Sequence, residues 1–572
     1  MPDNHQRGGA RRRSAATAAA MLALLALFSY LGTLRDGPGA QTRKGSASKT
    51  DTARERERRD GASKKSEGDA PSARERGAND TRRADTELAR LFDSQLEEGE
   101  FAQARWGIFV VSLRDGRTVY ARNHDRLFTP ASVFKVYTTA VALDMLGADY
   151  RWSTSVYAAR EPDASGTVEG DLTLYGRGAP DLNARASTQS APSLAALADE
   201  LYRRGVRRVR GGVVGDESYF RGEALGSGWL WEDVQWYYGA HPSALTVGGN
   251  ELTVSVGPGA RAGDPVEVRL FPPTDYVRVT NEMKTGERGS HPRIGITRSL
   301  SSNNVRVWGS FPSGGSPYGV RLSVDRPALW AAEQFRDMLR ARGIEVAGDA
   351  RMRDARAAEE ERFDPSGAFE LAFVRSRTLG EVVRGVNKES INLEAELILR
   401  TLGRERGSQL PAPQPVGRER NDDEAGDALI RLWLERAGIP VEGLALHDGS
   451  GLSRLNLVTP EATARLLARI SETASAGVFR ASLPVAGRDG TLATRLRGTP
   501  AATSRQPVAA KTGSLTYINS LAGYAETEDG EPLAFAIFCN DETGRASSTR
   551  AIDALVLLLA RYPELPSQTT EP

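Results

Sequence analysis

The order in which helical and strand patterns follow one another limits the possible folds of this chain more than any other feature. Short alternating strands separated by turn residues dominate residues 148–365, with one clear helix among them. A hairpin at residues 106–120 and a helix at residues 133–146 are predicted before that stretch. The helices and strands predicted after it could complete the same domain. We therefore predict an α/β fold in which one domain, residues 86–147 and 366–565, is split by a β-rich insert.

The first 85 residues differ from the rest in composition. Arg11, Arg12 and Arg13 precede an uncharged run, residues 14–34, which fits either a cleaved export signal within residues 1–34 or a retained membrane anchor. Residues 35–85 contain no aliphatic residue larger than alanine and no aromatic residue, so they predict a disordered, charged tether. The basic flank places the body outside the cytoplasm, as an exported or periplasmic protein. Residues 566–572 are a short tail.

Composition excludes several classes of function. The net charge is +1, so a strongly basic face is not required and nucleic acid is not a favoured partner. The single cysteine, Cys539, excludes a disulfide framework. The five histidines show no metal-ligand spacing, so we predict neither a metal site nor a cofactor.

Lysine is rare in the body of the chain. Residues 86–572 contain four lysines, Lys135, Lys284, Lys388 and Lys511, among many arginines. Arginine is effectively never deprotonated, whereas lysine can lose its proton when its pKa is lowered. The lysines therefore direct attention to places where a proton has to move.

Ser132 and Lys135 form the pattern Ser132-Val133-Phe134-Lys135 at a predicted helix start. Residues three apart lie on one face of a helix, so the hydroxyl and the amine can meet. A serine is a weak nucleophile until an adjacent base takes its proton. Lysine can be that base only if its pKa, about 10.4 in model peptides, is lowered by burial or by a second cation. We predict Ser132 as the nucleophile and Lys135 as its base.

Lys511 opens the sequence Lys511-Thr512-Gly513-Ser514, after an apolar run that suits a buried strand. Gly513 would let a peptide substrate approach an edge strand closely. Lys511 would supply the second cation and a docking point for a substrate carboxylate. The similar Lys284-Thr285-Gly286 has polar neighbours and is less suited to this role.

Ser390 and Asn392 lie between two predicted helical segments, where a loop can direct side chains into a cleft. Ser390 could relay a proton, and Asn392 could hydrogen-bond a substrate amide. Each of the three fragments is a weak signal alone. Their order and contexts together predict that Ser132, Ser390 and Lys511 converge on one cleft.

The three fragments resemble the signature of active-site serine penicillin-interacting enzymes, in which Ser-x-x-Lys, Ser-x-Asn and Lys-Thr-Gly line one cleft. The long segment between Ser132 and Ser390 is similar to the insertion of the penicillin-binding protein 4 type of D-alanyl-D-alanine carboxypeptidase. Ala179 departs from the Asp that this type often has there. Other stretches resemble the same type: Gly176–Pro180, Trp229–Asp233, Tyr237–Ala240, Asp448–Arg454 and Gly487–Leu492.

The resemblance implies a serine β-lactamase/DD-peptidase-like domain with an antiparallel sheet flanked by helices. It implies that Ser132 attacks the penultimate D-Ala carbonyl of a peptidoglycan stem peptide while Lys135 accepts its proton and Ser390 relays it to the leaving group. Lys511 and Thr512 would hold the terminal carboxylate.

The resemblance also implies an oxyanion hole made by the backbone N–H groups of Ser132 and Ser514. β-Lactam antibiotics would acylate Ser132 as covalent inhibitors. Cleavage of peptidoglycan cross-bridges is an open second activity.

Two alternatives stay open at this point. A β-lactamase uses the same three fragments, although a lactam substrate does not require so long an insert. A non-catalytic penicillin-binding cell-wall protein is the other, and the intact Ser132, Lys135 and Lys511 speak against it.

Overall fold

The structure is a computed structural model, and it describes residues 73–97, 101–184, 191–411, 419–543 and 548–562. The predicted signal or anchor, residues 35–72 of the predicted tether and the tail lie outside the described residues. Within the described part of the chain, none of the helices is both long enough and apolar enough to cross a membrane.

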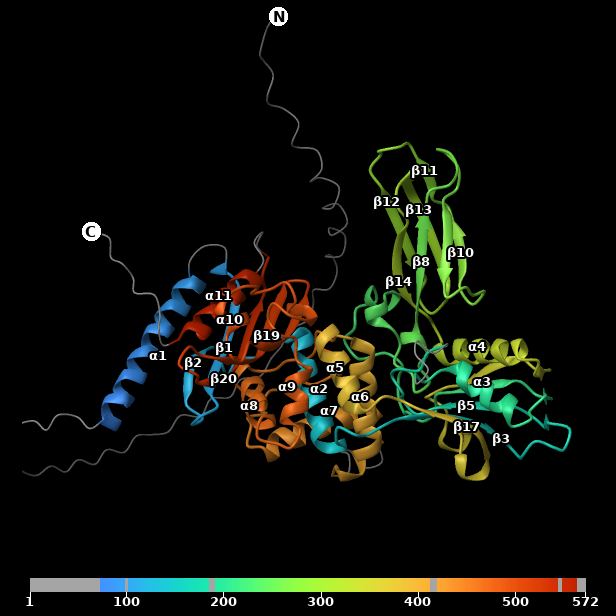
Figure 1. The fold of residues 1–572 in the computed structure, drawn as a ribbon, viewed down its shortest axis with the longest axis horizontal. Coiled ribbons are helices and arrows are strands. Elements are labelled where there is room, and N and C mark those ends of the chain that lie inside the picture. Colours follow the sequence, from blue (N-terminus) through green and yellow to red (C-terminus); the bar gives the residue numbers. More distant parts are fainter. Residues whose placement is uncertain (1–72, 98–100, 185–190, 412–418, 544–547, 563–572) are drawn as a thin grey trace, which may run out of the picture. The chain divides into compact units, whose positions relative to one another are not determined.

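One antiparallel sheet of five strands joins the two ends of the body (Figure 1). Its strand order is β18 (Ala509–Leu515), β19 (Ile518–Glu526), β20 (Pro532–Asn540), β1 (Arg105–Ser112) and β2 (Thr118–Arg122). β1 pairs with β20 along its whole length, from Arg105 opposite Asn540 to Ser112 opposite Leu533. The predicted split α/β fold with an antiparallel sheet is therefore confirmed.

Both faces of this sheet are buried. Successive side chains of a strand point to opposite faces, and the consecutive apolar residues of β1 are buried on both. Phe109 and Val111 belong to one apolar core, whereas Ile108 and Val110 belong to the core on the opposite face. The first core also contains α2 (Lys135–Leu146), α5 (Leu379–Glu389), α6 (Asn392–Arg406), α7 (Asp422–Arg436), α8 (Pro460–Ile470) and α9 (Ala476–Ser482). The second is covered by α1 (Ala73–Glu97), α10 (Pro500–Thr503) and α11 (Ser548–Arg561).

Helix α1 corrects one boundary of the predicted tether. It begins at Ala73, so the last part of residues 35–85 is helical rather than disordered. Leu88, Phe92 and Leu96 recur every four residues and are buried against the sheet. Packing of this apolar face stabilises the helix, which continues upstream into a stretch whose apolar residues are alanines alone.

The insert contains a second five-stranded sheet. Its order is β16 (Ala350–Arg353), β7 (Val213–Asp216), β5 (Leu172–Gly176), β3 (Ser153–Ala158) and β17 (Phe369–Arg375). Helix α4 (Pro327–Ala341) was predicted, whereas α3 (Leu194–Arg203) was not; both pack into the core of this sheet. Because β17 pairs with β3, the insert extends to Arg375, beyond the predicted boundary at residue 365. A small sheet joins β4 (Thr167–Val168), β6 (Arg208–Val209) and β15 (Glu345–Val346).

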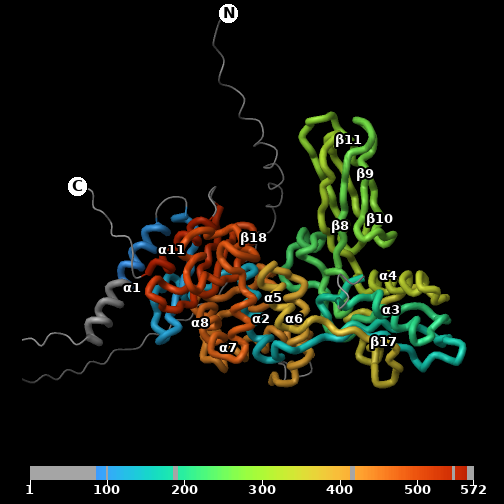
Figure 2. Tube along the Cα trace, in the orientation of Figure 1, coloured from blue at the N-terminus to red at the C-terminus, as the bar shows by residue number. Residues whose placement is uncertain are grey.

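The middle of the insert, residues 251–323, is built of strands and the loops that join them (Figure 2). Its apolar core also includes Trp330 of α4. One sheet has the order β14 (Tyr318–Ser323), β8 (Glu251–Gly257) and β9 (Glu267–Phe271). The other contains β10 (Arg278–Asn281), β13 (Asn304–Pro312) and β11 (Lys284–Gly286), with β12 (Arg293–Arg298) paired to β13. Lys284-Thr285-Gly286 forms β11 in this region, and the Lys284 side chain is exposed.

Candidate active site

Ser132 lies in a short 3₁₀ turn, Ala131–Phe134, directly before Lys135 begins α2. A 3₁₀ turn aligns residues three apart more closely than an α-helix does. The Lys135 amine donates a hydrogen bond of 3.0 Å to Ser132 Oγ, and the lysine side chain is 0% exposed. The predicted nucleophile and its predicted base are thus in direct contact.

Two further acceptors hold the Lys135 amine. Asn392 Oδ1 lies 2.6 Å from Nζ and the Ser450 carbonyl oxygen lies 2.7 Å from it. Burial lowers the pKa of Lys135 to about 7, against the opposing effects of the Asp448 and Glu396 carboxylates. The amine can therefore exist in its neutral form near physiological pH.

Lys511 and Ser390 form a second contact of the same kind. Lys511 Nζ donates to Ser390 Oγ at 2.9 Å and to the Thr512 carbonyl at 2.8 Å. Burial, and next the charge of Lys135, lower the pKa of Lys511 well below its usual range. Lys511 was expected to lower the pKa of Lys135; in the structure burial is what lowers it.

Ser390 occupies the end of α5 in a left-handed conformation, with φ 60°. Helix α5 starts at a capping box formed by Thr378 and Glu381 and buries Leu379, Val382, Val383 and Val386 on one face. Helix α6 begins two residues after Ser390, at Asn392, so a sharp turn places both side chains toward Lys511 and Lys135.

The remaining members of the third fragment lie on β18. Thr512 Oγ1 is 2.7 Å from Thr491 Oγ1, and the exposed Ser514 donates its hydroxyl to Asn519 Oδ1 at 2.9 Å. Gly513 faces the turn that carries Ser132. A Cβ atom there would lie 2.6 Å from the Pro130 carbonyl oxygen and 2.9 Å from the Val133 nitrogen. The glycine thus allows the edge strand to approach the turn that carries Ser132.

Substituting Gly513 by alanine should damage the site through this close contact. The added methyl group would push β18 away from the turn, since backbone atoms cannot move aside as a side chain can, at a cost of about 1–3 kcal/mol in unfolding free energy. We expect the rate of acylation by a fluorescent penicillin to fall about 10-fold or more. Gly477→Ala is the matched control, because a Cβ atom there meets open space. Equal rates for the two variants would contradict this reading.

A cleft of about 1220 Å³ opens beside these residues. Ser132, Ser390, Asn392 and Ser514 line it, whereas the ammonium groups of Lys135 and Lys511 belong to side chains that are 0% exposed. The insert contributes to the same cleft: Trp236, Tyr237, Tyr238, Gly248, Glu251 and Arg321. Arg321 lies over the Tyr237 ring at 3.6 Å from its centroid.

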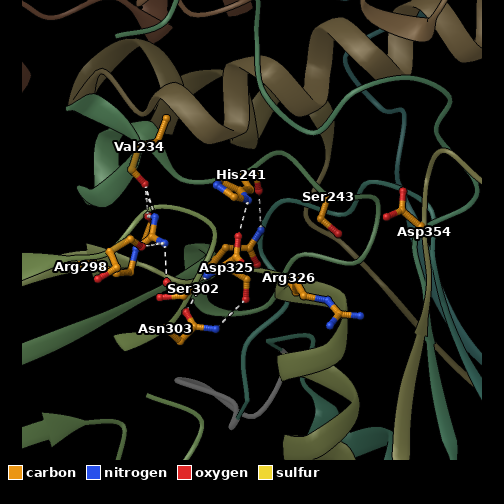
Figure 3. A network of polar contacts seen from close by, with 12 residues as sticks. Val234, His241, Ser243, Arg298, Ser302, Asn303, Asp325, Arg326 and Asp354 are labelled. Carbon is orange, nitrogen blue, oxygen red and sulfur yellow. Dashed lines mark hydrogen bonds and ion pairs between the residues drawn. The ribbon is translucent and has the colours of Figure 1, made fainter. Parts of the chain in front are cut away.

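The insert also holds one of the predicted site residues. Asn392 Nδ2 donates to the Tyr238 carbonyl at 2.8 Å. Tyr238 follows the short turn of Val234, whose carbonyl accepts from the buried Arg298 guanidinium at 2.5 Å (Figure 3). The same guanidinium donates to the Ser302 carbonyl and to Ser323 Oγ. The β-structured middle of the insert therefore supports the wall of the cleft next to Asn392.

His241 and Asp325 lie in the same polar network, at 3.9 Å (Figure 3). Burial lowers the pKa of His241 to about 4, more than Asp325 raises it. The imidazole is therefore neutral at physiological pH and is packed inside the insert.

Three residues that contact or surround Lys135 were not predicted as site residues: Glu396, Asp448 and Ser450. Ser450 lies in the short bend after Asp448, and its carbonyl oxygen accepts from the amine. Lys388 is the third lysine of the domain that the insert splits, and its amine is bound to groups other than Ser132, Ser390 and Asn392. Its amine pairs with Asp489 at 2.7 Å and with the Leu483 carbonyl at 2.6 Å.

Both the sequence and the fold of this chain have known relatives. Residues 88–562 match the D-Ala-D-Ala carboxypeptidase 3 (S13) family. A D-alanyl-D-alanine carboxypeptidase of Actinomadura sp. (strain R39) is 36% identical over 488 residues, covering 83% of this chain and 85% of the relative. The D-alanyl-D-alanine carboxypeptidase DacB of Haemophilus influenzae is 25% identical over 435 residues, 76% of this chain and 85% of the relative.

The fold has a solved counterpart. The crystal structure of penicillin binding protein 4 (dacB) from Haemophilus influenzae superposes with a TM-score of 0.67 at 23% identity. The likeness covers 82% of this chain and 99% of that one. It therefore includes the insert as well as the domain that the insert splits.

Proposed function

This chain belongs to the D-Ala-D-Ala carboxypeptidase 3 (S13) family and is a serine-type D-Ala-D-Ala carboxypeptidase, and we propose that Ser132 forms its acyl-enzyme with peptidoglycan stem peptides. The observation that carries the proposal is the 3.0 Å contact between Ser132 Oγ, which lines the cleft, and the buried Lys135 amine. A lysine with a pKa of about 7 can accept the proton that a serine nucleophile has to lose.

In the first half of the reaction, Ser132 Oγ attacks the carbonyl carbon of the penultimate D-Ala while Lys135 takes the hydroxyl proton. The backbone N–H groups of Ser132 and Ser514 stabilise the oxyanion. Ser390, which lies beside Lys511, relays a proton to the amine of the departing D-Ala. Water then attacks the acyl carbon and gives a proton to the neutral Lys135 amine. The bond between that carbon and Ser132 Oγ breaks, Oγ takes the proton back, and the shortened peptide leaves with a free carboxyl group.

Lys511 and Thr512 hold the terminal carboxylate of the substrate. Because burial lowers the pKa of Lys511, the arriving carboxylate supplies the negative charge that favours its protonated form. Asn392 Oδ1 accepts from the Lys135 amine, and one N–H of its Nδ2 donates to the Tyr238 carbonyl. The second N–H of Nδ2 donates to an amide carbonyl of the substrate. Gly513 keeps β18 close to the turn of Ser132, so a peptide backbone that docks along the edge of β18 lies next to the nucleophile.

β-Lactam antibiotics acylate Ser132 as covalent inhibitors in this proposal. The enzyme acts outside the cytoplasm, and residues 14–34 serve as export signal or membrane anchor. The basic flank of that run and the peptidoglycan substrate support this placement.

Release of D-Ala from a stem pentapeptide, measured beside hydrolysis of benzylpenicillin, tests the function. We expect D-Ala release together with slow loss of the penicilloyl group. Rapid turnover of penicillin without D-Ala release would favour a β-lactamase, and the absence of both reactions would favour a non-catalytic binding protein.

The rate of acylation should depend on pH in a defined direction. Only the neutral amine of Lys135 accepts a proton, and its fraction rises as the pH passes through its pKa of about 7. The rate of labelling by a fluorescent penicillin, followed from about pH 5 to about pH 9, should therefore rise and then level off. A rate that stays constant or falls across this range would contradict the role of Lys135 as the base.

A further inference from the structure

The turn of residues 448–451 supplies a backbone acceptor for the Lys135 amine, whereas its other acceptors among the described residues are the side chains of Ser132 and Asn392. The Ser450 carbonyl oxygen lies 2.7 Å from Nζ, and the turn is buried. Gly451 packs directly on the turn of Ser132, since a Cβ atom there would lie 2.0 Å from the Ala131 carbonyl oxygen. The position of this turn therefore decides where the amine can point.

Glu396 holds the N–H side of the turn. Its Oε1 accepts hydrogen bonds from the backbone nitrogens of Gly449 at 3.0 Å and Ser450 at 2.8 Å. Glu396 is 1% exposed and lies one helical turn after Asn392 on α6. One face of α6 therefore acts on Lys135 in two ways. Asn392 accepts a hydrogen bond from the amine directly, and Glu396 holds the turn whose Ser450 carbonyl accepts another.

Two other groups fix the turn from different sides. The Thr138 hydroxyl on α2 donates to the Gly449 carbonyl at 2.7 Å. The Asp448 carboxylate accepts from the backbone nitrogens of Gly451 at 2.8 Å and Ser453 at 2.7 Å. The turn is therefore held to α2, which begins with Lys135, and to α6, which begins with Asn392.

The arrangement of acceptors orients the base. A neutral amine has two N–H groups and one lone pair in a tetrahedral arrangement around nitrogen. When Asn392 Oδ1 and the Ser450 carbonyl take the two N–H groups, the lone pair points toward the third neighbour, Ser132 Oγ. Loss of either acceptor would let the amine rotate and would direct an N–H group at the hydroxyl instead.

We infer that Glu396 is a positioning residue for the acylation step, which acts by holding the Ser450 carbonyl against Lys135. This inference rests on the proposed function of Ser132 and Lys135. Glu396 touches neither the substrate nor the reacting atoms in this account. Its positioning effect comes from an acceptor oxygen in a fixed place. Its charge acts separately, because the carboxylate raises the pKa of Lys135 against the effect of burial.

The test compares Glu396→Gln with Glu396→Ala, with the exposed Glu435→Ala on α7 as a control. Glutamine keeps a carbonyl oxygen for the two backbone nitrogens, whereas alanine keeps none. Titration with a fluorescent penicillin counts the active sites, and kcat and KM for D-Ala release from a pentapeptide are then expressed per titrated site.

We expect Glu396→Gln and Glu435→Ala to stay close to wild type at about pH 8, where the Lys135 amine is mostly neutral with or without the Glu396 carboxylate. Glu396→Ala should lose about 100-fold in kcat and in acylation rate per site, with KM nearly unchanged, as expected for a misplaced catalytic group. A wild-type rate per site in Glu396→Ala would overturn the inference, because fewer sites at full rate indicate a structural role alone. Equal losses in the Gln and Ala variants would also overturn it, because they indicate an effect of charge.

If Glu396→Ala does not fold, Thr138→Val tests the same turn from α2 with a side chain of similar shape. We expect kcat to fall about 10-fold with KM kept, and an unchanged kcat would overturn the inference. A wild-type chain that neither reacts with penicillin nor releases D-Ala would overturn the proposed function together with it. A reactive wild type beside an equally reactive Glu396→Ala would overturn the inference alone.

Discussion

Ser132→Ala should abolish both D-Ala release and labelling by penicillin. The acyl-enzyme forms on Ser132 Oγ, which the alanine lacks, and the nearby hydroxyl of Ser390 belongs to the Lys511 pair. Removal of a catalytic serine elsewhere costs more than about 10,000-fold in kcat, so we expect activity at or near the detection limit. D-Ala release from a pentapeptide and in-gel fluorescence of the penicillin adduct provide the measurement.

The substitution removes one hydroxyl from a half-buried position, so the thermal midpoint should stay close to that of the wild type. Binding of a substrate that cannot be turned over should also persist, since the proposed carboxylate site at Lys511 is intact. Labelling of Ser132→Ala at the wild-type rate would show that another residue is the nucleophile.

Lys135→Arg should be nearly as damaging, although it keeps the positive charge. Arginine does not lose its proton in proteins, so it can donate to Ser132 Oγ but cannot accept the hydroxyl proton. Its larger planar head must also fit a space where the lysine amine already has three acceptors within 3.0 Å. Loss of a general base costs about 100- to 10,000-fold, and the rate of penicillin acylation per folded molecule measures it.

Lys284→Arg is the matched control for this substitution. Lys284 begins the other Lys-Thr-Gly sequence and is exposed on β11, so it should tolerate arginine without loss of activity. Full activity of Lys135→Arg would refute the proposed base, because the remaining chemistry would then not need a neutral amine at that position.

The parts of the site that depend on local geometry could be predicted from the sequence. Ser132 and Lys135 are three residues apart at a helix start, so their contact follows from the helix itself. Lys511 and Ser390 come from distant segments, and only the combination of three short patterns indicated that they meet. The apolar alternation and turn residues were sufficient to predict the split sheet and the β-rich insert.

The rest could not be predicted because it depends on tertiary packing. Glu396 looks like one more acidic residue of an amphipathic helix until the turn at Ser450 is packed beside it. The bond from Asn392 to the Tyr238 carbonyl joins residues far apart in sequence and uses a backbone atom, which no residue type reveals. The start of α1 and the pairing of β17 with β3 were missed for the same reason, since a packed neighbour outside the local window determines each of them.

Mass spectrometry of the intact protein and of its peptides after treatment with benzylpenicillin tests the central claim most directly. The account predicts one penicilloyl adduct per chain, located on the peptide that contains Ser132, slow to disappear and absent from Ser132→Ala. An adduct on any other residue, or a wild-type protein that stays unmodified while penicillin is left intact, would contradict it.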